Sequence, residues 1–174
     1  MTGIDQVQRT MTEATETTEF PEMVEMTEMT EVKEMTAKDW KTLKKKDWVF
    51  DWKKESTKFN RTVFKLVIEG NQDVLQGMIS LENMQGFVYV SLIESISYNK
   101  GINKVYEGVA GNLFAYACKV SDELGFDGFV AFDAKTALVG HYQKTLGATI
   151  AGGTRMFIAE VAANKLINRY FNKN

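Results

Sequence analysis

Hydrophobic and polar positions alternate through the middle of the chain in runs that are typical of β-strands. The clearest run covers residues 87–94, and similar runs cover residues 62–69 and 75–81. Short turns at residues 70–71 and at Gly86 separate these runs. Because strands joined by short turns pair with their neighbours, the pattern predicts an antiparallel meander.

Further along the chain, apolar positions recur every three or four residues, which predicts a helix from about Val109 to Leu124. The next strand, at residues 128–133, is reached through this helical crossover and is therefore expected to lie parallel to its partner. Three more elements are predicted: a helix at 136–146, a strand at 154–159 and a helix at 160–171. The predicted fold class is α/β of the α+β kind, with a mixed, mostly antiparallel central sheet and flanking helices.

The first part of the chain follows a different pattern. From Thr12 to Met35 the sequence repeats in triplets, with Glu at every middle position. A period of three slips by about 60° per triplet on a helix of 3.6 residues per turn, so no helical face stays apolar. We therefore expect residues 1–38 to form an acidic, mostly disordered leader and residues 39–174 to form one folded domain.

Charge is divided in the same way. Residues 1–40 hold ten acidic and three basic residues, a net charge of −7, so the remainder carries +5 of the total of −2. A basic domain suits a polyanionic ligand. No run approaches the ~18 apolar residues of a membrane span. The one cysteine, Cys118, cannot form an internal disulfide and is expected to be buried, and a cytoplasmic location fits this reduced state.

Aromatic and basic residues are interleaved between Asp39 and Trp52, and the densest basic cluster is Lys44-Lys45-Lys46. Such a segment can bind nucleic acid through charge and stacking. It can also be a short helix whose aromatic side chains cover the hydrophobic core, and we favour this structural interpretation.

A turn of small residues precedes the long predicted helix. Gly108, Ala110 and Gly111 leave the main chain accessible where the helix begins. The first N–H groups of a helix have no partner inside it, and the aligned peptide dipoles make this end partly positive. The turn therefore suits an anion such as phosphate, and an ordinary tight turn is the alternative.

This order of elements, and two motifs within it, resemble the GNAT family of acyl-CoA-dependent N-acetyltransferases over residues 48–159. The family's loop pattern Arg/Gln-x-x-Gly-x-Gly/Ala is similar to residues 105–111, although Val105 replaces the Arg or Gln. The family's second signature, a Tyr followed by Lys and a Leu-Gly-Phe-like end, is similar to residues 142–148, where Ala148 replaces the Phe. The resemblance implies a GNAT-like fold with acetyl-CoA as co-substrate and no metal.

By this resemblance, main-chain atoms would hold the cofactor. The N–H groups at the helix start, with Lys104 nearby, would bind the CoA pyrophosphate. The backbone after the strand at 87–94 would pair with the pantetheine arm as an added strand. The predicted cofactor-binding residues are Ser95, Ile96, Ser97, Lys104, Gly108, Val109, Ala110, Gly111, Asn112 and Leu113.

Two side chains are candidates for the chemistry of transfer. Tyr142 is the predicted acid, because a phenol with a pKa of about 10 can donate to a departing thiolate whose acid has a pKa of about 8.5. Glu94 is the predicted base, because it ends the strand where the family's acceptor amine meets the thioester. The alternatives are a packed aromatic for Tyr142, and a strand-end charge or acceptor-binding anion for Glu94. Direct attack by the amine requires no nucleophilic cysteine.

The acceptor side of the site departs from the family pattern. Family members usually have two helices between their first and second strands, whereas about ten residues separate Trp52 from Thr62. Either residues 40–52 supply this wall, or the cleft is open, or a partner completes it. An open cleft would admit a macromolecular amine, so the sequence leaves the acceptor undetermined. It also leaves open whether the protein forms a homodimer.

Three functions fit these observations. The first is an N-acyltransferase that moves an acetyl group from acetyl-CoA to a primary amine by direct attack. The second is a catalytically silent GNAT-like module that binds acyl-CoA, and the third is a protein or nucleic-acid interaction module that uses Lys44-Lys45-Lys46. The single histidine, His141, has no neighbouring cluster of carboxylates or cysteines and predicts no metal site.

Overall fold

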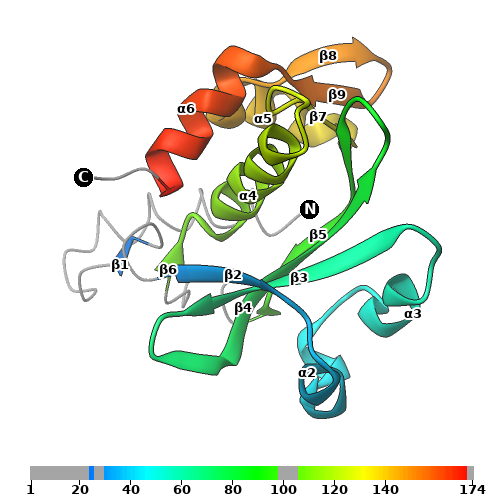
Figure 1. The fold of residues 1–174 in the computed structure, drawn as a ribbon, viewed down its shortest axis with the longest axis vertical. Helices are drawn as coiled ribbons and strands as arrows, with labels where there is room; N and C mark the ends of the chain where they lie inside the picture. Colours follow the sequence, from blue (N-terminus) through cyan, green and yellow to red (C-terminus); the bar gives the residue numbers. More distant parts are fainter. Residues whose placement is uncertain (1–23, 26–29, 98–105, 172–174) are drawn as a thin grey trace.

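A seven-stranded sheet runs through the centre of the protein (Figure 1). The computed structural model describes residues 24–25, 30–97 and 106–171. The strand order in the sheet is β2-β3-β4-β5-β7-β9-β8, and every neighbouring pair is antiparallel except β5 and β7. The strands are β2 (Thr30–Glu34), β3 (Arg61–Ile68), β4 (Asn71–Asn83), β5 (Val88–Ser95), β7 (Val130–Asp133), β8 (Thr149–Gly152) and β9 (Arg155–Ile158). A separate two-residue strand, β1 (Val24–Glu25), pairs parallel with β6 (Tyr106–Glu107).

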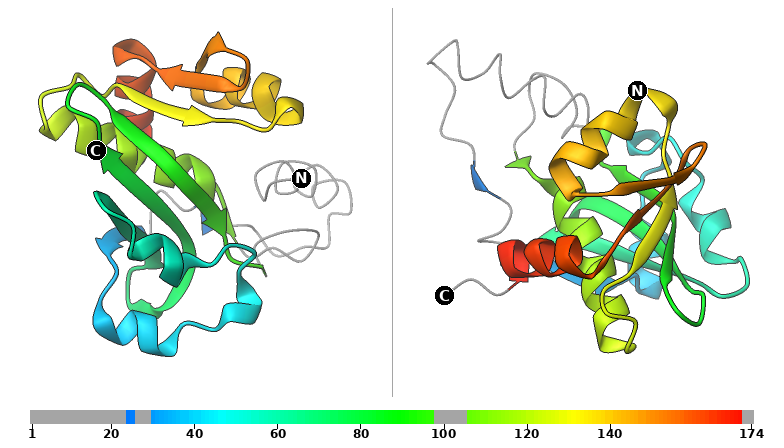
Figure 2. Two further views of the ribbon diagram at one scale, coloured as in Figure 1. Left: turned by 90° about the vertical axis from the view of Figure 1, so that its right-hand side faces the viewer. Right: turned by 90° about the horizontal axis from the view of Figure 1, so that it is seen from above.

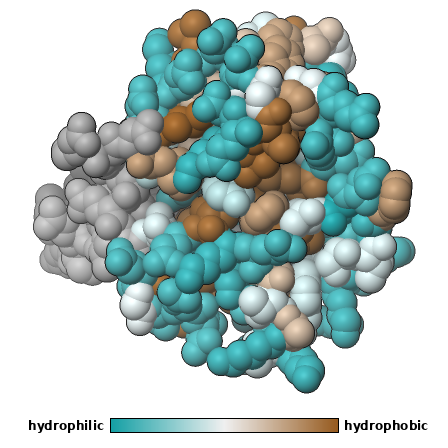
Figure 3. Space-filling view, viewed as in Figure 1, coloured by the Kyte–Doolittle hydropathy of each residue, from teal (hydrophilic) through white to brown (hydrophobic). Residues whose placement is uncertain are grey.

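Helices cover both faces of this sheet. The helical segments are α2 (Ala37–Thr42), η2 (Lys45–Asp47), α3 (Trp52–Ser56), α4 (Val109–Glu123), η4 (Thr136–Leu138), α5 (Val139–Leu146) and α6 (Glu160–Phe171). Helix α4 packs on β4 and β5, and α6 packs against α4 (Figure 2). Figure 3 shows hydrophobic residues between hydrophilic ones over the middle of the face that carries α4.

The hydrophobic core has two parts, one on each side of the sheet. Ile79 belongs to the larger cluster beneath α4, whereas the adjacent Met78 belongs to a smaller cluster with Trp48 and Trp52. Successive residues of a strand point to opposite faces, so the segment from α2 to α3 covers the face opposite α4. This arrangement confirms the predicted fold class, the meander β3-β4-β5 and the parallel placement of β7.

The triplet repeat contributes a strand that the sequence pattern did not predict. Residues 30–34, expected in the leader, form β2. All five residues of β2 pair antiparallel with residues 64–68 of β3. A period of three excludes a stable helical face, but an edge strand needs only backbone pairing and one inward side chain, here Val32. Strand β8 was also missed. The remaining leader residues, 1–23 and 26–29, lie outside the described residues, so the expectation for them stays a prediction.

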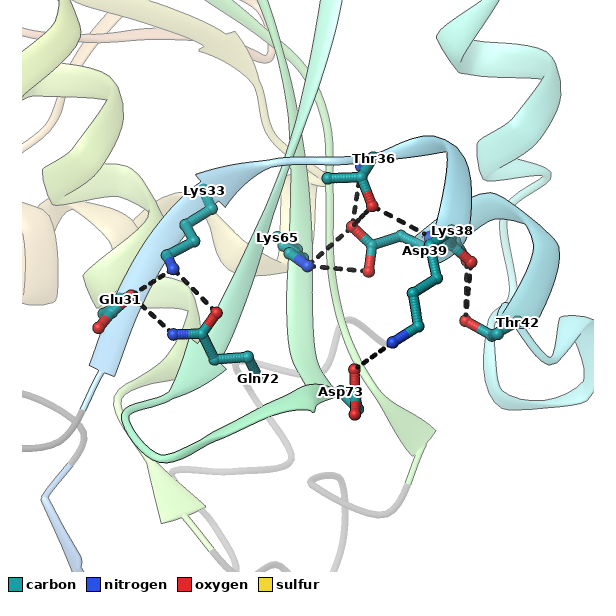
Figure 4. A network of polar contacts seen from close by, with 9 residues as sticks. All are labelled: Glu31, Lys33, Thr36, Lys38, Asp39, Thr42, Lys65, Gln72 and Asp73. Atoms are coloured by element: carbon teal, nitrogen blue, oxygen red, sulfur yellow. Dashed lines mark hydrogen bonds and ion pairs between the residues drawn. The ribbon is translucent and has the colours of Figure 1, made fainter.

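The segment after β2 is joined firmly to the sheet, which moves the start of the folded domain before Asp39. The Thr36 hydroxyl caps α2, and the Asp39 carboxylate accepts from the Thr36 N–H at 2.8 Å (Figure 4). Lys65 of β3 pairs with Asp39 at 2.7 Å, and both side chains are buried. Burial acts to raise the pKa of Asp39, but the bonds from Lys65 and Thr36 outweigh it and lower that pKa.

Candidate acyl-CoA and acceptor site

The centre of the sheet opens where β5 and β7 part. Their parallel pairing covers Val88–Val90 of β5, and β7 has its ladder partners there and on β9. Directly after Val90, the register between β4 and β5 shifts so that Ser91 is an extra residue in β5. An extra residue of this kind bends its strand and increases the local twist. The bulge therefore directs the second half of β5 away from β7.

A cavity of about 190 Å³ lies in this opening. Glu94 and Tyr142, the two predicted catalytic residues, both line it. The other lining residues come from four places in the chain: Val49 and Phe50, Val90 to Ile93 on β5, Phe114 on α4, and Phe132 to Lys135 at the end of β7. The tertiary structure thus brings together the candidates that the sequence separates by almost fifty positions.

Helix α4 begins beside the end of β5. Gly108 precedes the helix with φ 78°, a left-handed conformation that favours glycine, and as the N-cap residue it has no side chain that could cap the first turn. On β4, Gly77 pairs with Ser95 and lies so close to α4 that a Cβ there would approach Val109 Cγ1 to 2.7 Å. The predicted cofactor residues on β5 and α4 therefore meet around Gly77.

The structure narrows the set of main-chain donors at this helix start. The Asn112 N–H already donates to the Gly108 carbonyl at 2.9 Å, as in any helix interior. The Asn112 side chain is buried and donates to Thr30 of β2 at 2.7 Å, so it links β2 to α4. Leu113 is fully buried in the core. The first-turn donors that suit an anion are those of Val109, Ala110 and Gly111.

Besides access of an anion to the main chain, helix packing also explains why position 111 is a glycine. A Cβ at Gly111 would overlap the hydroxyl of Tyr170 on α6, and the same hydroxyl lies near Gly108. A side chain at position 111 would therefore make the Tyr170 ring shift, so a small residue suits the packing of α6 on α4 independently of any ligand. Lys104 lies outside the described residues, and Ser97 is exposed at the edge of that gap.

Tyr142 projects from α5 into the aromatic side of the cavity. Its ring packs against Phe114 at 5.7 Å and Phe132 at 5.3 Å between centroids, in edge-on geometry. The side chain is 4% exposed. Edge-to-face packing of this kind fixes the orientation of a ring. His141 beside it contacts the Tyr142 ring at 5.8 Å, which agrees with a packing role.

Glu94 lies on the other side of the cavity. Its carboxylate accepts hydrogen bonds from the N–H groups of Val49 and Phe50 and from the Trp52 indole. The side chain is buried, at 6% exposure. These contacts tie β5 to the turn before α3, which forms the facing wall of the cavity.

The structural interpretation of the aromatic and basic segment agrees with the fold. Trp48 and Trp52 are buried in the smaller core cluster, so neither ring presents a free face for a nucleobase. Lys44, Lys45 and Lys46 are exposed. Cys118 is fully buried, and burial raises the pKa of its thiol to about 12, which suits an inert side chain.

The described residues contain no group of three or more His, Cys, Asp or Glu side chains arranged to hold a metal ion. In the same part of the chain, no helix combines the length and apolar character needed to cross a membrane.

Solved structures share this architecture. No protein-family model matches the sequence, and no curated protein sequence matches it. A spermidine/spermine N-acetyltransferase, SpeG from Vibrio cholerae, is similar over 80% of this chain and 98% of its own, at 15% identity and a TM-score of 0.54. An acyl-CoA N-acyltransferase from Pseudomonas aeruginosa is similar over 75% and 98%, at 17% identity and a TM-score of 0.54. The structure of AtaTR bound with acetyl-CoA is similar over 79% and 98%, at 12% identity and a TM-score of 0.53.

The chain has the GNAT fold. In this fold β2 is the first strand of the sheet, and α2 and α3 lie between it and the second strand, β3. The sequence pattern placed no pair of helices between the first and second strands. The structure does have this pair, because the first strand lies inside the triplet repeat. Of the three alternatives for this side of the cavity, the structure agrees with the first, in which residues 40–52 supply a wall, since Val49 and Phe50 line the cavity.

Sequence reasoning missed several residues of the GNAT-fold cavity. Asp133, at the end of β7, receives bonds from Arg155 at 2.7 Å and Tyr89 at 2.8 Å. The Arg155 bond is the main reason that the pKa of Asp133 is lowered. Its position at a strand end could have indicated it, because functional groups gather there. Ser91 had no such signal, because a bulge depends on the register between two strands.

Proposed function

We propose that the protein transfers an acetyl group from acetyl-CoA to a primary amine by direct attack. The observation that supports this proposal best is the cavity where β5 parts from β7, with Tyr142 in its lining. The uncapped start of α4 lies beside the end of the same strand. A thioester in that cavity would have its diphosphate within reach of a helix start and its sulfur near a phenol.

Main-chain atoms hold the cofactor in this proposal. The N–H groups of Val109, Ala110 and Gly111 bind the pyrophosphate, and Lys104 adds a positive charge. The edge of β5 that faces β7 carries no ladder partner beyond Val90 among the described residues. This edge and the segment Ser95–Ser97 would pair with the amides of the pantetheine arm, because unpaired main-chain groups need a partner. The Ile96 N–H is not among these groups, since it donates to the Gln76 carbonyl at 3.0 Å.

The chemistry follows from proximity and one proton donor. The neutral amine attacks the thioester carbon, a C–N bond forms and the C–S bond breaks. Tyr142 gives its proton to the leaving thiolate. The attacking nitrogen, which becomes positively charged as the C–N bond forms, loses one proton to water, and Tyr142 regains a proton from that water. An alkylammonium has a pKa of about 10, so it loses a proton before attack, and we assign that proton to water at the open mouth. Glu94 was predicted as its acceptor, but its carboxylate accepts hydrogen bonds from Val49, Phe50 and Trp52.

The first test separates cofactor binding from all other functions. Acetyl-CoA at one hundred times its Kd adds about 2.7 kcal/mol of stability to a protein that binds it. A clear rise in the melting temperature is expected with acetyl-CoA and a smaller one with adenosine alone. Absence of any shift with acetyl-CoA would contradict the cofactor and favour the interaction module.

The second test separates an enzyme from a silent binding module. Thiol release is measured with a panel of amines, including spermidine, phenethylamine and a peptide with a free N-terminus. Tyr142→Phe is expected to lower turnover by about 10² to 10⁴ without weakening acetyl-CoA binding. Tyr116→Phe is the matched control, since Tyr116 on α4 packs on Phe64, outside the cavity lining. Binding without thiol release would identify a silent module, and unchanged turnover in Tyr142→Phe would exclude its acid role.

The location of the protein belongs to the same proposal. A buried, unreactive cysteine and acetyl-CoA as co-substrate both suit the cytoplasm. The acceptor is left to the amine panel, in which macromolecular and small amines are compared directly.

A further inference from the structure

The carboxylate of Glu94 accepts three hydrogen bonds from one short turn. The Val49 N–H donates to Oε2 at 2.6 Å, and the Phe50 N–H donates to Oε1 at 3.1 Å. The Trp52 indole N–H donates to the same Oε1 at 2.8 Å. A carboxylate offers about four acceptor positions, and three of them are occupied by the segment from Trp48 to Trp52, here called the 48–52 turn.

The 48–52 turn has buried residues at its two ends and exposed residues between them. Trp48 and Trp52 are 9% and 1% exposed and contact one another in the smaller core cluster. Val49 and Phe50 are 78% and 41% exposed, and both line the cavity between β5 and β7. Because Val49 and Phe50 are not held by packing in the core, the backbone that carries them needs another contact to fix its position. The Glu94 carboxylate, which lines the same cavity, accepts from both of their main-chain N–H groups and provides this support.

The position of Glu94 on β5 explains why this support affects the site. Glu94 follows the Ser91 bulge, in the part of β5 that has left β7. The same stretch of strand therefore lines the cavity and also holds the adjacent turn in place. A base needs a lone pair directed at the substrate, whereas these oxygens are directed at the turn.

We propose that Glu94 is a positioning residue that holds the 48–52 turn against the mouth of the cavity, so that Val49 and Phe50 form the wall met by the acceptor amine. The part of this inference that concerns the acceptor rests on the proposed acyl transfer. The part that concerns the turn does not, and it can be measured without any substrate.

The first experiment measures the turn itself by hydrogen exchange. Glu94→Gln keeps the size of the side chain but replaces one acceptor oxygen with an NH₂ group, which cannot accept the Val49 or Phe50 N–H. Exchange of these two amides is expected to accelerate about tenfold or more, because a charge-assisted bond is lost. Asp39→Asn is the matched control, since Asp39 is equally buried, at 7% exposure, but contacts α2 and β3 instead. Equal acceleration in both variants, or none in Glu94→Gln, would overturn the proposal.

The second experiment uses steady-state kinetics with the most active amine of the panel. Glu94→Gln is expected to raise the KM for that amine about tenfold while kcat stays within about threefold and the Kd of acetyl-CoA is unchanged. Loss of kcat, together with loss of the acidic limb of the kcat profile against pH, would instead identify Glu94 as the base. If the wild-type protein releases no thiol, the proposed function fails, and hydrogen exchange alone decides the role of Glu94.

A milder variant covers the case in which Glu94→Gln does not fold. Trp52→Phe keeps an aromatic ring in the core and removes the indole donor to Oε1. Exchange at Phe50, whose N–H shares Oε1, is expected to change by at least about twofold relative to the amides of β3. A change at Phe50 no larger than that of β3 would contradict the proposed link.

Discussion

Glu55 is a buried carboxylate at the junction of α3 and β5, and it is 1% exposed. Its Oε2 accepts from the Ser91 hydroxyl at 2.6 Å and pairs with Arg61 at 3.0 Å, while Lys58 pairs with Oε1. Burial acts to raise the pKa of Glu55, but the bonds from Ser91, Lys58 and Arg61 outweigh it and lower the pKa to about 2. Glu55 thus holds the bulge residue that opens the cavity.

This lowered pKa predicts acid-sensitive stability. A group whose pKa is lower in the folded state stabilises the fold above its unfolded value, here 4.5, and that contribution is lost as the pH falls towards about 2. Glu55→Gln is expected to cost about 1.5–3 kcal/mol near neutral pH, because bonds to a charged group are lost. Chemical denaturation of both proteins between pH 7 and pH 2.5 measures the difference.

The sign of the pH dependence makes this prediction specific. The gap in unfolding free energy between wild type and Glu55→Gln should shrink as the pH falls below 4.5. Other carboxylates with lowered pKa values, such as Asp39 and Asp133, affect both proteins equally. A gap that stays constant or widens in acid would contradict the assigned role of Glu55.

Among the elements, β2 decides where the folded domain begins. It covers the outer edge of β3, in which Leu66 and Val67 are fully buried. An uncovered edge strand exposes unpaired N–H and C=O groups and invites association with another chain. The strand is therefore needed for a soluble fold, although its sequence belongs to a polar repeat.

Two shortened chains test this assignment. A chain that begins at Met35 lacks β2 and is expected to aggregate or to melt at least about 10 °C lower, since an edge of the sheet is lost. A chain that begins at Met29 retains β2 and serves as the matched control. Thermal denaturation and size-exclusion chromatography compare them. Equal melting temperatures for the two chains would show that β2 contributes little.

For the whole molecule, the main feature is an acidic N-terminal part joined to a basic remainder. Residues 1–29 contain seven acidic residues and one basic residue, a net charge of −6, which leaves +4 for residues 30–174. Strand β1 lies in this acidic part and pairs with β6, directly before Gly108 and the start of α4. The backbone of this part of the chain thus passes next to the proposed pyrophosphate site at Val24–Glu25.

Neutralising this charge should favour a polyanionic cofactor. With Asp5 changed to Asn and the six Glu residues of positions 1–29 changed to Gln, acetyl-CoA is expected to bind on the order of threefold more tightly at 50 mM salt. The difference should disappear at about 0.5 M salt, where the Debye length falls to only a few ångströms. Calorimetric titration at both salt concentrations measures it. Equal affinities at low salt would contradict electrostatic coupling between the two parts.

The sequence determined the elements whose signal is local. The meander β3-β4-β5 has alternating runs between turns, α4 has apolar residues at helical spacing, and β7 follows a crossover that fixes its direction. Glu94 was chosen as a candidate because it ends β5, and Tyr142 because it lies in a motif on α5; both have suitable chemistry. The burial of Cys118 was also predictable, since it lies on the apolar side of α4.

Tertiary structure decided the features that depend on pairing between distant segments. Strand β2 exists because β3 offers it an edge, and Ser91 bulges because β4 and β5 are out of register there. The three donors that occupy Glu94 come from a turn more than forty positions earlier in the chain. Periodicity reports which face of an element is buried, but not which segment covers it. The assignment of Glu94 to a base or to a support could therefore be addressed only in three dimensions.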